Sequence, residues 1–359
     1  MIDRDRLLAT FLSLLQISSE TGAEADIVRE VLFRLTSLGL RPRTDAAGNI
    51  IAVSPGDGGP YLVNAHVDTV MSTRGLKVIL QNDVVQTDGL TILGADDKAG
   101  VAAILEVVQC LVEGALPHTG LELVLTVGEE QGLLGAKVLD FGHLSSREGV
   151  CVDSSGPVGT IVTKAPSQAF IDVRVTGRAA HAGLAPEQGI SAVVAASEAI
   201  ARMRLGRIDE ETTANVGTIV GGTSRNIVPE RVGLKAEARS RDEAKLRDQI
   251  EHMRTAFEEA AARHRATAVV DVSEAYRGFD ISPDEPIVHR VVVAAKSVGI
   301  TPRLQATGGG SDANVFNQHG IKTVNLGAGY ENAHAPTERI AIDELVRCAT
   351  LLLAVFTLR

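Results

Sequence analysis

The sequence predicts a mixed α/β domain that is interrupted by a smaller α+β domain. In the first part of the chain, short apolar strand-like runs alternate with longer helical segments, which is typical of a mixed sheet flanked by helices, with some parallel strands. A middle region of roughly 110 residues follows the order β-α-β-β-α-β, the ferredoxin-like pattern. The first pattern then returns. We therefore expect a discontinuous domain formed by residues 1–166 and 277–359, with an inserted domain at residues 167–276.

The elements of the first domain follow from the spacing of its apolar residues. Apolar residues three and four positions apart predict helices at 3–16, 24–39 and, after a loop with an aspartate cap, 94–114. Strand-like runs are expected at 49–55, 61–68, 121–127 and 149–153.

The inserted domain shows a cleaner alternation of apolar and polar residues. Strands are expected at 167–177, 214–221, 231–239 and 267–275, and helices at 190–205 and 241–265. The mixed α/β pattern resumes at 282–299. The C-terminal run "CATLLLAVFTLR" is too short and too interrupted to span a membrane, so we expect a buried helix there.

Length, charge and cysteine content narrow the class of protein. A chain of 359 residues is long for a single core, which agrees with two domains. The formal net charge of −10 argues against nucleic acid or an anionic membrane as a main partner. The N-terminus lacks the order of basic, apolar and small residues that marks a signal peptide. Three widely separated cysteines indicate neither a disulfide framework nor a cysteine zinc site, and a cytoplasmic location fits best.

Five short stretches place carboxylates and histidines at the ends of apolar runs. The carboxyl ends of strands in an α/β sheet gather at one edge, where ligands bind. One such residue alone is most often an ordinary polar turn residue, but five stretches together predict a site. They are "NAHVD" with His66 and Asp68, "GADDKAG" with Asp96 and Asp97, "TVGEE" with Glu129 and Glu130, "VDSSG" with Asp153, and "GYENAHAPTE" with His334 and Glu338.

The residue types in these stretches favour a metal site. Two imidazoles and several carboxylates, without thiolates, suit zinc, cobalt or manganese. The set is large enough for two ions if one carboxylate bridges them. A water between two such ions has its pKa lowered towards about 7, and a remaining carboxylate could take its proton. Asp68 lies two residues after His66 on the same face of a strand, from where it could orient the imidazole.

Seven motifs occur in an order that resembles a known enzyme family. They are "NAHVDTV", "GADDKAGVAA", "TVGEEQGLLGAK", "VDSSG", "GRAAHAG", "NIVPE" and "GGGSDAN". The set resembles the co-catalytic di-zinc hydrolases that include peptidase T, glutamate carboxypeptidase, succinyl-diaminopimelate desuccinylase and the aminoacylases. It is most similar to the peptidase T-like branch. The resemblance implies a zinc-binding α/β domain interrupted by a lid domain through which the protein forms a homodimer.

The resemblance also implies the metal ligands and the catalytic residues. One zinc ion would be held by His66, Asp96 and Asp153, and the other by Asp96, Glu130 and His334, with Asp96 bridging. Glu129 would be the general base and Asp68 would orient a ligand histidine, while the peptide bond between Asp96 and Asp97 would be cis. We expect Asp97 and Lys98 to support the site structurally, and Glu338 to act as a local cap or ion-pair partner.

Further residues in the inserted domain and after it match substrate-binding positions of the family. His181 would stabilise the oxyanion in the active site of a partner subunit. Asn226 and Arg239 would contact substrate, and the fork of Arg239 suits a carboxylate. Gly309 and Gly310 would offer backbone N–H groups. A surface histidine, an ordinary salt bridge and a plain glycine turn are the alternatives at these positions.

Taken together, these features predict a cytoplasmic, homodimeric di-zinc metallopeptidase that acts on short peptides. Removal of the N-terminal residue, as by a tripeptidase, is the favoured activity. A deacylase of N-acyl amino acids would use the same chemistry and differ only in its side pockets. A metal-stabilised scaffold without catalysis is the third alternative, although every predicted metal ligand and the base are present.

Overall fold

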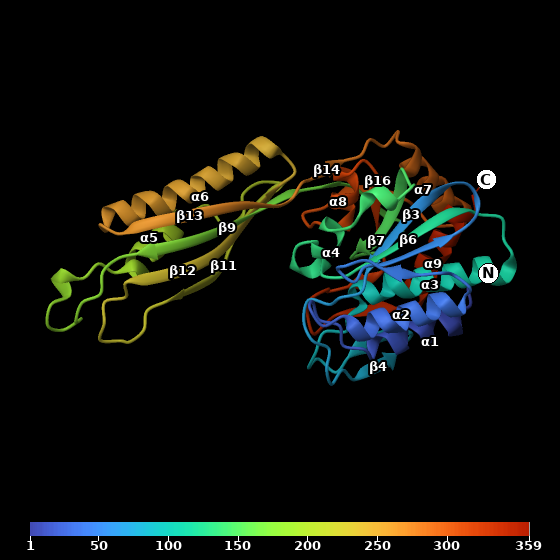
Figure 1. Cartoon of the computed structure of the whole chain (residues 1–359), viewed down its shortest axis with the longest axis horizontal. Coiled ribbons are helices and arrows are strands. Elements are labelled where there is room, and N and C mark those ends of the chain that lie inside the picture. Colours follow the sequence, from blue (N-terminus) through green and yellow to red (C-terminus); the bar gives the residue numbers. More distant parts are fainter. Residues whose placement is uncertain (359) are drawn as a thin grey trace. The chain divides into compact units, whose positions relative to one another are not determined.

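The computed structural model describes residues 1–358 and contains two compact units (Figure 1). The first unit comprises Met1–Lys164, Asp280–Ala306 and the chain from Ser311 onward. The second comprises Ala165–Phe279 and the short segment Thr307–Gly310. The predicted inserted range, 167–276, lies within the second unit.

A mixed sheet forms the centre of the first unit. Its strand order is β1-β2-β6-β3-β7-β16-β8-β14, and β15 pairs with β8. These strands are β1 (Arg43–Thr44), β2 (Ile50–Ser54), β3 (Asp57–His66), β6 (Thr119–Thr126), β7 (Glu148–Ser154), β8 (Thr160–Ala165), β14 (Phe279–Asp280), β15 (Arg303–Ala306) and β16 (Lys322–Gly327). The central strands β6, β3, β7 and β16 are parallel, so their carboxyl ends meet at one edge. The predicted mixed sheet is confirmed.

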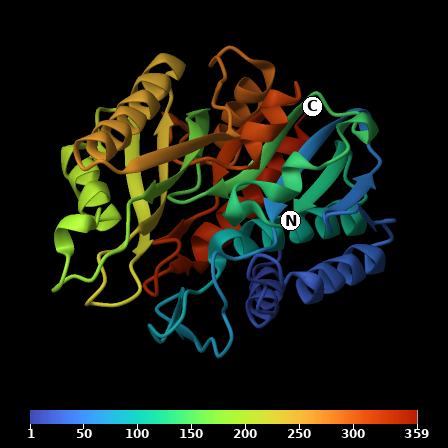
Figure 2. The same ribbon diagram turned by 60° about the vertical axis from the view of Figure 1, so that its left-hand side comes forward.

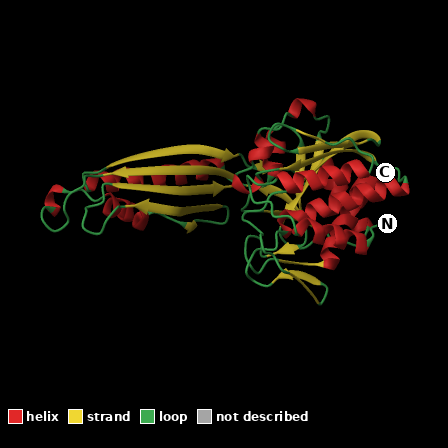
Figure 3. Ribbon diagram, turned by 60° about the horizontal axis from the view of Figure 1, so that its bottom comes forward, coloured by secondary structure: helices red, strands yellow, loops and turns green. Residues whose placement is uncertain are grey.

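Helices flank this sheet (Figure 3). They are α1 (Arg4–Leu15), α2 (Ala25–Ser37), α3 (Ala95–Gly114), α4 (Leu134–Lys137), α7 (Pro286–Ser297), α8 (Asp312–Gln318) and α9 (Ile342–Thr357). Helix α3 contacts α1 and α9, and its apolar residues are buried nearly all round. Near α4 and α8, Phe316 packs with Ile51, Leu62 and Val124. The predicted C-terminal helix is present as α9, and no helix within residues 1–358 combines the length and apolar character that a membrane span needs.

A second, smaller sheet of the first unit was not predicted. Its order is β17-β18-β5-β4, formed by β4 (Val78–Gln81), β5 (Val84–Thr87), β17 (Tyr330–Glu331) and β18 (Arg339–Ala341). Strands β4 and β5 are short and β4 is mostly exposed, so they show little alternation of apolar and polar residues. The sheet pairs β18 with β5 and thereby places the loop that carries His334 beside the segment leading into α3.

The second unit has the predicted ferredoxin-like arrangement. It contains β9 (Ser167–Thr176), α5 (Ala192–Arg202), β10 (Gly206–Arg207), β11 (Thr212–Gly221), β12 (Arg231–Ser240), α6 (Glu243–Arg263) and β13 (Thr267–Tyr276). The antiparallel sheet has the order β10-β11-β12-β9-β13. Along β9, buried residues alternate with exposed ones from Ala169 onward, as the sequence predicts. Helices α5 and α6 cover the apolar face of this sheet (Figure 2).

Candidate metal centre

The predicted metal residues lie where neighbouring parallel strands end. His66 is the last residue of β3, and Asp153 lies near the end of the adjacent strand β7. Glu129 and Glu130 follow β6 directly, in the short 3₁₀ turn η1 (Glu129–Gln131). The edge of the sheet therefore collects residues from three strands, as expected for a binding site of an α/β fold.

Two groups of side chains offer ligand atoms that lie within 4.8 Å of one another. The first metal group is His66, Asp96 and Asp153, and the second metal group is Asp96, Glu130 and His334. His66 Nε2 is 3.1 Å from Asp96 Oδ1 and 3.7 Å from Asp153 Oδ1. His334 Nε2 is 3.3 Å from Asp96 Oδ2 and 2.9 Å from Glu130 Oε1. Each oxygen of Asp96 thus faces a different group, which is the arrangement a bridging carboxylate requires.

The chemistry of these groups fits divalent cations. Glu130 Oε1 is buried, and its contact in the described part of the chain is with His334 Nε2, 2.9 Å away. Burial raises the pKa of Asp153 well above its ordinary range, and the charges of Asp96 and Asp97 add to the rise. Contacts with Asp96 and Glu130 raise the pKa of His334 to about 10. Crowded, buried carboxylates beside two histidines are what a cation would stabilise.

The metal-free protein is expected to lose stability as the pH rises from about 5 to 8. Burial raises the pKa of Glu129 and Asp153 well above their ordinary values, so the folded chain holds protons that the unfolded chain has released. Where the folded state binds more protons, stability falls with increasing pH. Thermal unfolding after treatment with a chelator measures this trend, which saturating zinc should weaken or reverse. If the melting temperature of the metal-free protein rose over this pH range, the folded chain would not hold extra protons on its buried carboxylates, and the description of the site would be wrong.

The segment that leads into α3 presents Asp96 to both groups. The peptide bond between Asp96 and Asp97 is cis, as the resemblance predicts. The buried carboxylate of Glu338 accepts hydrogen bonds from the backbone N–H groups of Leu93 and Gly94, each at 2.8 Å, and of Asp96 at 2.9 Å. Glu338 is therefore a cap of this segment, as expected, and lies outside the two metal groups.

Asp97 and Lys98 are both fully buried beside the metal groups. Asp97 accepts hydrogen bonds from the N–H of His66 at 3.3 Å and from the N–H of Gly100 at 3.2 Å. It therefore caps the regular part of α3 and ties it to the end of β3. The ammonium of Lys98 donates to the carbonyl of Ile17 at 2.6 Å, and burial lowers the pKa of Lys98 to about 8.

Asp68 has a second role that the sequence did not reveal. Its carboxylate is 3.4 Å from His66 Nδ1, and its own carbonyl oxygen is nearer, at 3.0 Å. The same carboxylate accepts hydrogen bonds from the N–H groups of Glu129 at 3.0 Å and Glu130 at 3.3 Å, and from the hydroxyl of Thr21 at 2.6 Å. Asp68 thus contacts the ring of His66, as its predicted role requires, and also fixes the backbone of the paired glutamates.

The paired glutamates diverge because the chain turns at Gly128. Gly128 has φ +65°, in the left-handed region that favours glycine, and it ends the strand before Glu129. Glu130 enters the second metal group, whereas Glu129 belongs to neither group. Burial raises the pKa of Glu129 well above its ordinary range, with a further contribution from the charge of Asp153. Two adjacent carboxyl groups therefore occupy different chemical environments.

Two polar residues of the centre were missed. The hydroxyl of Tyr330 donates to Asp96 Oδ1 at 3.0 Å and to Asp153 Oδ1 at 3.3 Å. The side chain of Asn325 accepts from the N–H of Asp153 at 2.9 Å and donates to its carbonyl at 2.7 Å, which fixes the backbone of this member of the first metal group. The sequence signal that could have identified Tyr330 is its position in "GYENAHAPTE", four residues before His334.

The predicted substrate-binding residues lie in the second unit. The exposed His181 accepts N–H hydrogen bonds from Gly183 and Leu184 on Nδ1, so the ring proton of its neutral form is on Nε2, where it is available to a ligand. The carbonyl of Asn226 accepts from the N–H of Ala182 at 3.0 Å, which places Asn226 beside the His181 turn.

The other residues of this predicted set are Arg239, Gly309 and Gly310. The guanidinium of Arg239 donates two hydrogen bonds, at 3.0 and 3.2 Å, to the carboxylate of Glu237 in the same strand. Gly309 and Gly310 lie in the segment Thr307–Gly310. A Cβ on Gly310 would lie 2.2 Å from the ring of Tyr276, so packing alone requires glycine there.

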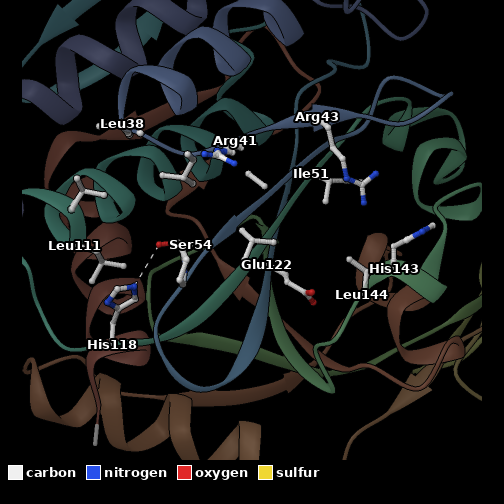
Figure 4. A pocket seen from close by; sticks show the side chains of 16 residues that line it. Leu38, Arg41, Arg43, Ile51, Ser54, Leu111, His118, Glu122, His143 and Leu144 are labelled. Atoms are coloured by element: carbon white, nitrogen blue, oxygen red, sulfur yellow. Dashed lines mark hydrogen bonds between the residues drawn. The ribbon is translucent and has the colours of Figure 1, made fainter.

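A separate cavity of about 620 Å³ in the first unit contains none of these residues (Figure 4). It is lined by apolar side chains around strand β2 and by Arg41, Arg43, His118 and His143. His118 is 3.5 Å from the hydroxyl of Ser54. These two histidines thus lie outside the metal groups.

Comparison with known proteins decides the family. The family model described as Peptidase family M20/M25/M40 matches residues 62–357, which is most of the chain. The chain belongs to this family.

Relatives across the M20 family support the assignment. Protein YqjE of Bacillus subtilis, whose function is uncharacterised, is 44% identical and covers 99% of this chain and 98% of its own. The crystal structure of aminopeptidase PepT from Bacillus cereus is 42% identical, with a TM-score of 0.86, and that of a tripeptidase from Staphylococcus aureus is 41% identical, with a TM-score of 0.93. Both structures cover 99% of this chain and 98% of their own.

The M20 match confirms the predicted enzyme class. Peptidase T of Listeria welshimeri is 25% identical over 83% of this chain and 74% of its own length. The predicted resemblance to the peptidase T-like branch and the prediction of a peptide-bond hydrolase are therefore confirmed. The M20 family is metal-dependent, and this chain has the two metal groups described above.

Proposed function

We propose that this chain is a di-metal aminopeptidase that removes the N-terminal residue from short peptides, in the manner of a tripeptidase. The observation that carries the proposal is the division between Glu130, which joins a metal group, and Glu129, which stays outside both groups with a raised pKa. The related crystal structures named as an aminopeptidase and as a tripeptidase support the peptide class.

The residues of the centre divide the work of amide hydrolysis. When bound, two divalent ions, most simply zinc, would supply an acidified water and polarise the scissile carbonyl. His66, Asp96 and Asp153 would hold one ion, and Asp96, Glu130 and His334 the other.

Glu129 would move the proton during the reaction. It would take a proton from the attacking water and later deliver it to the departing amine. A carboxyl group with a raised pKa suits both steps, because it must accept a proton and give it back at the same pH.

We further propose that the second unit serves as a lid and dimerisation domain in a cytoplasmic homodimer. His181 would donate from Nε2 to the developing oxyanion in the partner's site, a contact typically worth roughly 3 kcal/mol of transition-state stabilisation. Asn226 and Arg239 would bind the substrate, and Arg239 would exchange its contact with Glu237 for a substrate carboxylate. Gly309 and Gly310 would present backbone N–H groups to the peptide.

A substrate panel tests this activity. The protein is loaded with zinc, cobalt or manganese and offered di-, tri- and tetrapeptides together with N-acetyl and N-succinyl amino acids. Release of the N-terminal residue from tripeptides is expected, with little turnover when the same tripeptide is N-acetylated. Hydrolysis confined to N-acyl amino acids would instead establish a deacylase, and no turnover of any amide with any metal would favour a scaffold.

A further inference from the structure

The hydroxyl of Tyr330 contacts Asp153 of the first metal group and the oxygen of the shared Asp96 that faces this group. It lies 3.0 Å from Asp96 Oδ1 and 3.3 Å from Asp153 Oδ1. The oxygen of Asp96 that faces the second metal group is Oδ2, which is 3.3 Å from His334 Nε2. The tyrosine side chain is 1% exposed, so its hydroxyl is positioned by protein atoms and not by solvent.

The backbone around Tyr330 is attached to the loop that follows Asp153. The carbonyl of Tyr330 accepts from the N–H of Gly156 at 3.0 Å, and the N–H of Ala328 donates to the carbonyl of Ser154 at 2.9 Å. On its other side, Tyr330 pairs with Ile340 of β18. The backbone of Tyr330 is therefore held in a fixed relation to the loop after Asp153.

We propose that Tyr330 is a positioning residue that sets the affinity of one of the two metal ions, the one held by His66, Asp96 and Asp153. The proposal rests on the di-metal function proposed above. A carboxylate oxygen has two lone-pair sites, so Asp96 Oδ1 can accept a hydrogen bond from the hydroxyl and still bind an ion. The hydroxyl has a single proton, and the shorter contact makes Asp96 its main acceptor.

Removal of this hydroxyl should weaken the binding of one ion and leave the binding of the other unchanged. Without it, Asp96 and Asp153 lose a buried donor that fixes the direction of their carboxylates towards the first metal group. Partners of this kind typically contribute about 10- to 100-fold in metal affinity. The second metal group uses Asp96 Oδ2, Glu130 and His334, none of which the hydroxyl contacts in the described structure.

The test is a titration of the metal-free Tyr330→Phe chain with cobalt. Binding is measured by calorimetry and by the absorption of the bound ion. One of two binding steps is expected to weaken by about 10- to 100-fold, with the other unchanged. Tyr61→Phe is the matched control, because it removes the same atom from the strand that carries His66, at a site where the ring lies 4.7 Å from the guanidinium of Arg290. Neither step should change in that control.

Ligand variants identify the affected step. In a Glu130→Gln chain, which keeps the first metal group whole, Tyr330→Phe should weaken the remaining ion by the same factor. If Tyr330→Phe does not fold without metal, the cobalt-loaded protein is challenged with a chelator. One equivalent should then leave at about 10- to 100-fold lower chelator activity than from the wild type.

The possible results separate this inference from the function it rests on. Equal weakening of both steps, or no weakening of either, would overturn the role of Tyr330 while leaving a two-ion wild type intact. A wild-type chain that binds fewer than two ions would instead overturn the proposed di-metal function.

Discussion

A Glu129→Gln enzyme is expected to keep both metal ions and to hydrolyse tripeptides about 10²- to 10⁴-fold more slowly than the wild type. Glutamine fills the same space, but it cannot accept the proton of the attacking water. Glu129 belongs to neither metal group, so its replacement removes no ligand. Its backbone N–H would still donate to Asp68, which keeps the turn in place. The loss should therefore appear in kcat, with metal content unchanged.

Two controls accompany this variant. Glu258→Gln removes one charge from an exposed position of α6 and should leave kcat and metal content unchanged. Metal analysis of each protein after dialysis against the same buffer excludes an indirect effect through the ions. Normal turnover by Glu129→Gln would exclude this residue as the general base.

An Asp96→Asn chain is expected to lose stoichiometric binding of both ions and nearly all activity. Each oxygen of Asp96 faces a different metal group, so one substitution damages two sites. The amide retains a single oxygen and places a donor NH₂ where the other ligand atom was. Because metal assistance contributes several kcal/mol to the transition state, the expected loss of activity is about 10⁴-fold or more.

Asp153→Asn is the matched comparison for Asp96→Asn, since the same chemical change then falls on a ligand of the first metal group alone. That chain should retain one ion. Metal content per chain after dialysis at a fixed free zinc concentration distinguishes the two variants. Two ions bound to Asp96→Asn would contradict the bridging role.

The metal residues could be predicted from the sequence because each follows an apolar run in a recognisable order. Parallel strands bring their carboxyl ends to one edge, so His66, Glu130 and Asp153 converge once the sheet forms. The ferredoxin-like unit was also predictable, because alternating burial along β9 leaves a direct trace in the sequence.

The residues that position the ligands could not be predicted in this way. Tyr330 and Asp96 are separated by 234 residues, and Asn325 and Asp153 by 172, so neither pair leaves a local pattern. The two N–H groups that Asp68 binds lie 61 and 62 residues further along the chain. Such contacts depend on how the loops after different strands meet, which periodicity does not encode.

The small sheet escaped prediction for a different reason. Strand β4 is mostly exposed, and a short exposed strand shows little apolar alternation. The turn residues Asn82 and Asp83, both with positive φ, were the local signal of this hairpin.

The division of labour between Glu129 and Glu130 is tested most directly by the zinc content per chain of two variants dialysed side by side. Glu129→Gln should retain two ions and Glu130→Gln should retain one, since only Glu130 is a member of a metal group. Turnover measured on the same samples with added zinc should stay low in Glu129→Gln. One ion in Glu129→Gln together with two ions in Glu130→Gln would contradict the assignment.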